Sequence, residues 1–162
     1  MDLDESELRQ AARNWLERRH HENRYIQKPL VLHDTGLSVT GFLKNNYKGD
    51  LLRRIPKYND MHVKPDIIAI LRTKHDTFAL MTAECKIDPV NTGDLRQAID
   101  YASVCCSYEA FFVFQGPLNQ VVKDRIRSGN SVYLGYNESG RLSKRILMLI
   151  QRKDAVFFPV RV

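Results

Sequence analysis

The chain is poor in cysteine, and this absence narrows the class of protein. Only three of its 162 residues are cysteines, with Cys85 alone and Cys105 and Cys106 adjacent. Such a set gives neither C-x-x-C pairs nor an even extracellular disulfide framework. It is also too small for the cysteine ligands of an iron–sulfur cluster. We therefore expect a protein of a reducing compartment that holds no such cluster.

Membrane and targeting signals are missing as well. No apolar run approaches the roughly 20 residues of a membrane-spanning helix, and no apolar segment follows the acidic start of the chain. We expect a cytoplasmic protein with no membrane partner. The histidines have no metal-ligand spacing, and we expect them at the surface: His20, His21, His33, His62 and His75.

The composition that is present is that of a globular protein. With 43% hydrophobic and 27% charged residues, the chain can bury a core, and its length suits a single domain over 1–162. A formal net charge of +6 and a pI near 9.3 favour a polyanionic partner such as nucleic acid. Because many basic proteins bind no polyanion, the charge supports such a partner without proving it.

Two apolar runs that meet charged residues carry most of the functional information. Asp66 directly precedes the apolar run 67–71, which has the length of a strand. The segment 78–87 reads as a second strand with one apolar face, and its other face carries Glu84 and Lys86 near the end of the strand. An antiparallel return places the start of the first strand beside the end of the second. We therefore expect Asp66 and Glu84 to lie side by side, where a hard divalent cation such as Mg²⁺ would relieve their repulsion.

The remaining patterns predict a mixed α/β protein with a central mixed β-sheet flanked by helices. The segment 44–62 is basic and carries two tyrosines, so it reads either as a nucleic-acid-facing loop or hairpin or as a solvated irregular segment. The other expected elements are helices over 5–25, 94–106 and 119–127, short β-like pieces over 30–43, strands over 110–114 and 132–136, and a C-terminal β-hairpin over 146–150 and 155–160.

The charged strand ends resemble a known signature. Pro65-Asp66, followed on the next strand by Glu84-Cys85-Lys86, is similar to the motif of the PD-(D/E)XK nuclease superfamily. The resemblance covers roughly residues 64 to 115. It implies a restriction-endonuclease-like fold and a Mg²⁺-dependent deoxyribonuclease, an endonuclease that cuts duplex or branched DNA.

The resemblance also implies a role for each residue of the motif. Asp66, Glu84 and the Cys85 carbonyl would ligate Mg²⁺, for which Mn²⁺ would substitute, and Glu5 on the first helix is the best-placed candidate for a further acidic ligand. The metal would lower the pKa of a bound water, so that hydroxide can attack phosphorus. Lys86 would orient this water and steady the developing negative charge.

A second motif lies on the helix that follows. Gln97 and Tyr101 match the Q-x-x-x-Y pattern of a subset that includes RecB-like and archaeal nucleases, and this match adds both residues to the catalytic set. Their spacing puts them on one helix face that could look over the strand ends. Asp94 with Gln97 could instead form a D-x-x-Q capping pair that serves only the helix start.

Every part of this interpretation has a structural alternative. Glu84 and Lys86 could be solvated or paired surface charges, and Glu5 a solvated glutamate at a helix start. For the whole protein, the alternative is a nucleic-acid-binding or assembly module that keeps the nuclease fold without turnover. Composition does not separate the two functions.

We also expect a homodimer, because one active site cuts one strand and the chain has no evident separate recognition domain. The aromatic C-terminal hairpin is the candidate interface, although such a run is more often core. Its apolar residues are Val156, Phe157, Phe158 and Val160.

Overall fold

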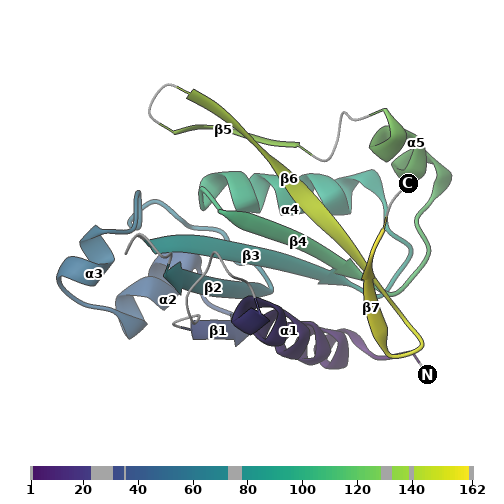
Figure 1. Ribbon diagram of the computed structural model, residues 1–162, viewed down its shortest axis with the longest axis horizontal. Coiled ribbons are helices and arrows are strands. Elements are labelled where there is room, and N and C mark those ends of the chain that lie inside the picture. The colour runs from purple at the N-terminus through teal and green to yellow at the C-terminus, as the bar shows by residue number, and fades with distance from the viewer. Residues whose placement is uncertain are drawn as a thin grey trace.

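A computed structural model describes residues 2–22, 31–34, 36–72, 78–128, 133–138 and 141–160, and in them a mixed β-sheet has helices on both of its faces (Figure 1). The elements are α1 (Glu5–Glu22), β1 (Val31–Asp34), α2 (Val39–Asn46), α3 (Asp50–Arg53), β2 (Ile67–Arg72), β3 (Phe78–Lys86), α4 (Thr92–Val104), β4 (Glu109–Phe114), α5 (Gln120–Arg127), β5 (Tyr133–Glu138), β6 (Arg141–Lys153) and β7 (Val156–Pro159). The predicted α/β class is confirmed.

The strands follow the order β1-β2-β3-β4-β6-β5, and β7 pairs with the far end of β6. β2 is antiparallel to both β1 and β3, whereas β3–β4 and β4–β6 are parallel pairs. A parallel pair needs a long crossover connection, and α4 supplies the one between β3 and β4. The antiparallel pairing of β6 with β7 confirms the predicted C-terminal hairpin.

One face of the sheet is covered by α1 (Figure 1). The buried residues of this helix, Leu8, Ala12 and Leu16, pack on a layer that includes Met81 and Ala83 of β3. In the same layer the ring of Trp15 meets Phe111 edge-on, with centroids 6.2 Å apart, and stacks on Phe157 at 5.5 Å. The predicted apolar face of β3 is therefore the face that α1 buries.

The opposite face is covered by α4 and α2. Leu95, Ala98 and Ala102 of α4 pack against β4 and β6, and Val39, Phe42 and Leu43 of α2 pack against β2 and the start of β3. Because both faces are covered, the middle strands are apolar almost throughout, as central strands usually are. Charged side chains on β3 occur at its end, in Glu84 and Lys86.

The predictions for 30–43 and 44–62 are partly wrong. Residues 39–46 form α2 instead of a β-like piece, because Val39, Phe42 and Leu43 fall on one helical face and the Ser38 side chain caps the helix by accepting a hydrogen bond from the Gly41 N–H at 3.1 Å. In 44–62 the structure places the end of α2, the short α3 and turns, and no hairpin.

The surface prediction for the histidines is corrected at one position. His20 is completely buried, and its burial is tolerated because both ring nitrogens have polar partners. One nitrogen lies 2.7 Å from the Leu16 carbonyl oxygen, and the other lies 2.8 Å from Oε2 of Glu109, a contact that links the end of α1 to the start of β4. His62 is exposed as predicted. The predictions for His21, His33 and His75 fall on side chains outside those that the structure describes.

Membrane insertion has no support from the helices. Among the residues that the structure describes, no helix has both the length and the apolar character needed to cross a bilayer.

Gly116 gives the first testable prediction. A Cβ at this position would lie 2.7 Å from the carbonyl oxygens of both Ile87 and Asp88, in the loop that follows Lys86. These are backbone atoms that cannot rotate away, so Gly116→Ala should lower the free energy of unfolding by about 1–3 kcal/mol. Urea unfolding measures the change. Gly36→Ala is the matched control, since a Cβ added there would have no other atom within 4 Å. Equal losses of unfolding free energy in the two variants would contradict this explanation.

Candidate active site

The first charged group of the site lies where β2 begins and β3 ends. The register pairs Ile67 with Ala83, and this places Asp66 opposite Glu84. The Asp66 N–H donates to Oε1 of Glu84 at 3.1 Å, and the Cys85 N–H donates to Oδ2 of Asp66 at 2.8 Å. The expectation that the two carboxylates lie side by side is confirmed.

These carboxylates open into a pocket of about 210 Å³ that is mostly polar. Its lining comes from α1, the β2 start, the β3 end, β4 and α4: Glu5, Arg9, Asp66, Glu84, Cys85, Lys86, Asp94, Gln97 and Phe112. The lining contains four carboxyl side chains and two cationic ones. When all are ionised, the pocket carries an excess of negative charge, which favours a cationic ligand.

Helix α1 brings a cation to the carboxylates. Nε of Arg9 lies 3.1 Å from Oδ1 of Asp66, and an amino group of the same guanidinium contacts Oε1 of Glu5, one turn earlier on the helix. Glu5, which the sequence singles out as a further acidic residue, is therefore in the pocket, although its side chain is 46% exposed and pairs with Arg9.

Gln115 fixes the start of α1 next to the site. Its side chain accepts from the Leu3 N–H at 3.1 Å and donates to the Leu3 carbonyl oxygen at 3.0 Å, while its own N–H donates to the Lys86 carbonyl oxygen at 3.1 Å. Arg152 of β6 donates to the same amide oxygen at 3.0 Å. One residue thus links the N-terminal segment, the β3 end and β6.

Lys86 faces the start of α4. Its Nζ lies 3.6 Å from Oδ1 of Asp94, with the lysine side chain 33% exposed. Asp94 is the third residue of α4 and forms a reciprocal capping box with Asn91, so the D-x-x-Q capping pair considered from the sequence is wrong. Because α4 begins earlier than expected, at Thr92, Gln97 is not needed for the cap.

Gln97 and Tyr101 are brought together, but only Gln97 lines the pocket. The Gln97 side-chain amide donates to the Tyr101 hydroxyl at 3.2 Å, one turn along α4. Tyr101 can therefore orient Gln97 without touching whatever occupies the pocket.

Burial and crowding change the ionisation of Glu84. Its pKa is raised from 4.5 to about 8, first by desolvation on burial and then by the neighbouring Asp66 charge, with Glu5 adding least in the same direction. The Asp66 N–H and the Arg9 charge act the other way. A proton on Glu84 therefore neutralises part of the acidic pair at neutral pH.

The sequence interpretation missed Arg9, Phe112 and the ionic role of Asp94. Arg9 was detectable in part, because it lies four residues after Glu5 and so shares its helix face. Its contact with Asp66 has no local signal, since the two residues meet only through the packing of α1 on the sheet.

The chemistry of this pocket suits a hard cation, but the oxygens do not yet converge on one. Carboxylates and a backbone carbonyl are the ligands that Mg²⁺ prefers. In the described part of the chain, no group of three or more His, Cys, Asp and Glu side chains is placed to hold a metal ion. Oδ1 of Asp66 is instead paired with Arg9, whose positive charge balances the carboxylate as a metal ion would.

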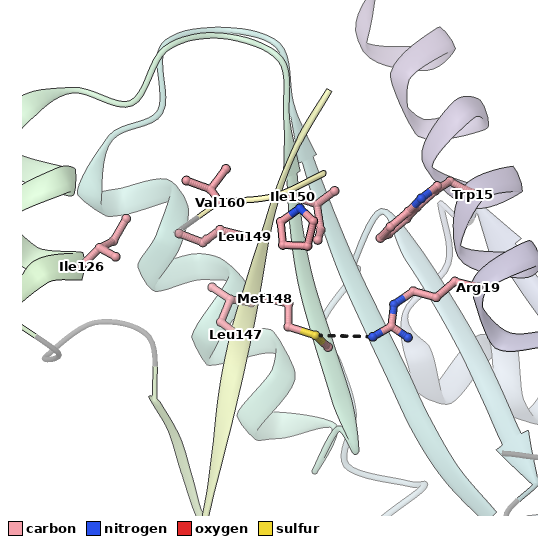
Figure 2. A pocket seen from close by; sticks show the side chains of 9 residues that line it. Trp15, Arg19, Ile126, Leu147, Met148, Leu149, Ile150 and Val160 are labelled. Atoms are coloured by element: carbon pink, nitrogen blue, oxygen red, sulfur yellow. Dashed lines mark hydrogen bonds between the residues drawn. The ribbon is translucent and has the colours of Figure 1, made fainter. Parts of the chain in front are cut away.

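A second pocket, of about 240 Å³, has a different character (Figure 2). Trp15 and Arg19 of α1 face a mainly apolar wall from β6 and β7, and Arg19 points toward the Met148 sulfur at 3.8 Å. Its lining has no carboxylate and no nucleophilic side chain: Trp15, Arg19, Ile126, Leu147, Met148, Leu149, Ile150, Pro159 and Val160. Of these two pockets, the first is the one that has side chains for acid–base or metal chemistry.

The raised pKa of Glu84 predicts a pH-dependent stability. Between pH 4.5 and about 8 the folded chain holds a proton on Glu84 that the unfolded chain has lost. The contribution of Glu84 to the free energy of unfolding in EDTA should therefore be complete below pH 4.5 and fall as the pH rises through this window. Urea unfolding at several pH values measures the slope, which Glu84→Gln should flatten. The exposed Glu17→Gln is the control; if Glu84→Gln keeps the same slope as this control, Glu84 is not the group responsible.

Known proteins give no independent identification of this site. Comparison of the chain with protein-family models, with curated proteins and with solved structures finds no match. The resemblance to PD-(D/E)XK nucleases therefore remains a prediction from the motif residues, and the function has to be argued from the geometry of the pocket.

Proposed function

We propose that the protein is a Mg²⁺-dependent DNA nuclease. The observation that carries the proposal is the pairing of Asp66 and Glu84 at one end of the sheet, with Lys86 on the same strand and all three in one acidic pocket. A solvated surface role does not account for Glu84, because the buried position that raises its pKa to about 8 disfavours a charge there.

The order of elements agrees with the motif resemblance. Pro65-Asp66 comes directly before β2, E-x-K ends β3, and the next element is the helix α4 that carries Gln97. We propose on this basis a restriction-endonuclease-like fold. DNA as the substrate follows from the resemblance, and the net charge of +6 suits any nucleic acid.

Asp66, Glu84 and the Cys85 carbonyl would hold the metal ion, with Glu5 near enough to contribute a further carboxylate. When bound, a divalent ion supplies Lewis-acid activation of water and stabilises charge on the phosphate oxygens. Mn²⁺ takes the same oxygen ligands and should substitute for Mg²⁺.

The chain's own residues supply position and charge. Lys86 places a cationic group at the pocket wall, where it can bind a phosphate oxygen or orient a water molecule, and Asp94 holds its amine at 3.6 Å. Gln97, oriented by Tyr101, offers an amide to the backbone of a bound strand.

Substitution of the motif residues tests this proposal. Glu84→Gln and Lys86→Ala should each reduce Mg²⁺-dependent cleavage at least about a hundredfold, because the first removes a carboxylate ligand of the metal ion and the second removes a positive charge near the reacting phosphate. Cleavage of supercoiled plasmid measures the loss, with circular dichroism to verify folding. Glu17→Gln, on the exposed side of α1, should cut like the unaltered protein. Undiminished cleavage by both motif variants would remove the assignment.

A second function, a nucleic-acid-binding module without turnover, is favoured by one observation. Oδ1 of Asp66 pairs with Arg9, an arrangement that is stable without any metal ion. The two functions separate when supercoiled, linear, branched and single-stranded DNA are incubated with Mg²⁺, Mn²⁺ or EDTA. Cutting that EDTA abolishes supports the nuclease, whereas retarded but uncut DNA in every condition supports the module.

We further propose a homodimer formed through β7. Of the four apolar residues in the candidate interface, Phe157 and Val160 pack on the core, while Val156 is 59% and Phe158 36% exposed. Alternation along the strand puts the two exposed residues on one face, which a second copy could cover.

Light scattering at micromolar concentration tests the dimer. The unaltered chain should have about twice its monomer mass of 18.8 kDa, and Phe158→Asp should return it to the monomer by placing a charge in the apolar contact. Val121→Asp is the control, because Val121 is equally apolar and 60% exposed but lies on α5. A monomer with and without DNA would exclude the dimer.

A further inference from the structure

Arg9 contacts the acidic pair from a position that the core holds firmly. The residues on either side of it along the buried face of α1, Leu8 and Ala12, are fully buried against the sheet. Gln115 anchors the segment before the helix through two hydrogen bonds to Leu3. The guanidinium is therefore brought to the carboxylates by rigid elements and not by a mobile loop.

The oxygens of Asp66 are divided between two kinds of partner. Oδ2 accepts the Cys85 N–H at 2.8 Å, a bond within the end of the sheet, and Oδ1 lies 3.1 Å from Nε of Arg9. The carboxylate oxygen that does not accept the Cys85 N–H is thus the one that pairs with Arg9. The Asp66 side chain is only 16% exposed, so water screens this ion pair less than it screens a pair on the open surface.

We infer that Arg9 is the resident cation of the metal-free site, and that a divalent ion must displace its guanidinium from Asp66 in order to bind. The inference rests on the proposed metal-dependent function. A metal ion at Asp66 and the guanidinium at 3.1 Å from the same carboxylate would repel each other. Arg9 therefore stabilises the pocket when no metal ion is bound and lowers its affinity for metal ions, while Glu5 contacts an amino group of the same guanidinium.

Metal affinity without turnover provides the test. Titration calorimetry with Ca²⁺ and with Mn²⁺, in the absence of DNA, should show that Arg9→Met binds the ion roughly tenfold more tightly than the unaltered protein, because a repelling charge is gone. In EDTA the same variant should melt at a lower temperature, and the ion should raise its melting temperature by more than it raises that of the unaltered chain.

Two further variants control for total charge and for folding. Arg18→Met removes the same charge from an exposed position on α1, nine residues and roughly 13 Å further along the helix axis, and should leave the affinity unchanged. Arg9→Lys keeps a positive charge at the site, although it loses the packing contacts of the guanidinium. It should bind the ion within about threefold of the unaltered protein.

The outcomes distinguish this inference from the proposed function. If Asp66→Asn loses ion binding but Arg9→Met binds no more tightly than the unaltered protein, Arg9 does not compete with the metal and the inference fails alone. If the unaltered chain and Arg9→Met both fail to bind Ca²⁺ and Mn²⁺, the metal site fails, and the inference fails with it.

Discussion

Two hydrogen bonds at the end of the sheet, from Asp66 to Glu84 and from Cys85 to Asp66, hold a pair of acids where neither is well solvated. Two ionised carboxylates about 4 Å apart repel by about 4 kcal/mol at an effective dielectric of 20. The surrounding charges respond to this crowding. The pKa of Glu84 is raised, so that it holds a proton more readily, and the guanidinium of Arg9 forms an ion pair with Asp66.

The rest of the fold makes this crowding tolerable. Even with the proton on Glu84 and the charge of Arg9, burial of two adjacent acids has a cost, which the packing elsewhere offsets within a total domain stability of roughly 5–15 kcal/mol. Here α1 buries one face of the sheet and α4 with α2 bury the other. Places where a protein departs from local rules are often functional, and the same crowding prepares the pocket for a proton, a guanidinium or a metal ion.

Much of the fold follows from local patterns. The runs that form β2 and β3 have the length and alternation of strands, and a strand's period of two fixes which side chains share a face. Other segments depended on context. Val39–Asn46 contains β-branched residues and a glycine, which favour a strand or a turn, yet it is a helix because its apolar side chains fill the space beside Ile68 and Ile70. His20 is polar, and only its partners Leu16 and Glu109 make its burial possible.

For the candidate site, the sequence by itself determined that Asp66 and Glu84 meet and that Lys86 is on the same face, because hairpin pairing and strand alternation are local rules. Only the tertiary structure decided which charged side chains form ion pairs with these motif residues. Arg9 reaches Asp66, and Asp94 reaches Lys86, through the packing of two helices against the ends of the strands. Ion pairs between separate elements depend on distances of a few ångströms, and no periodicity within either element encodes those distances.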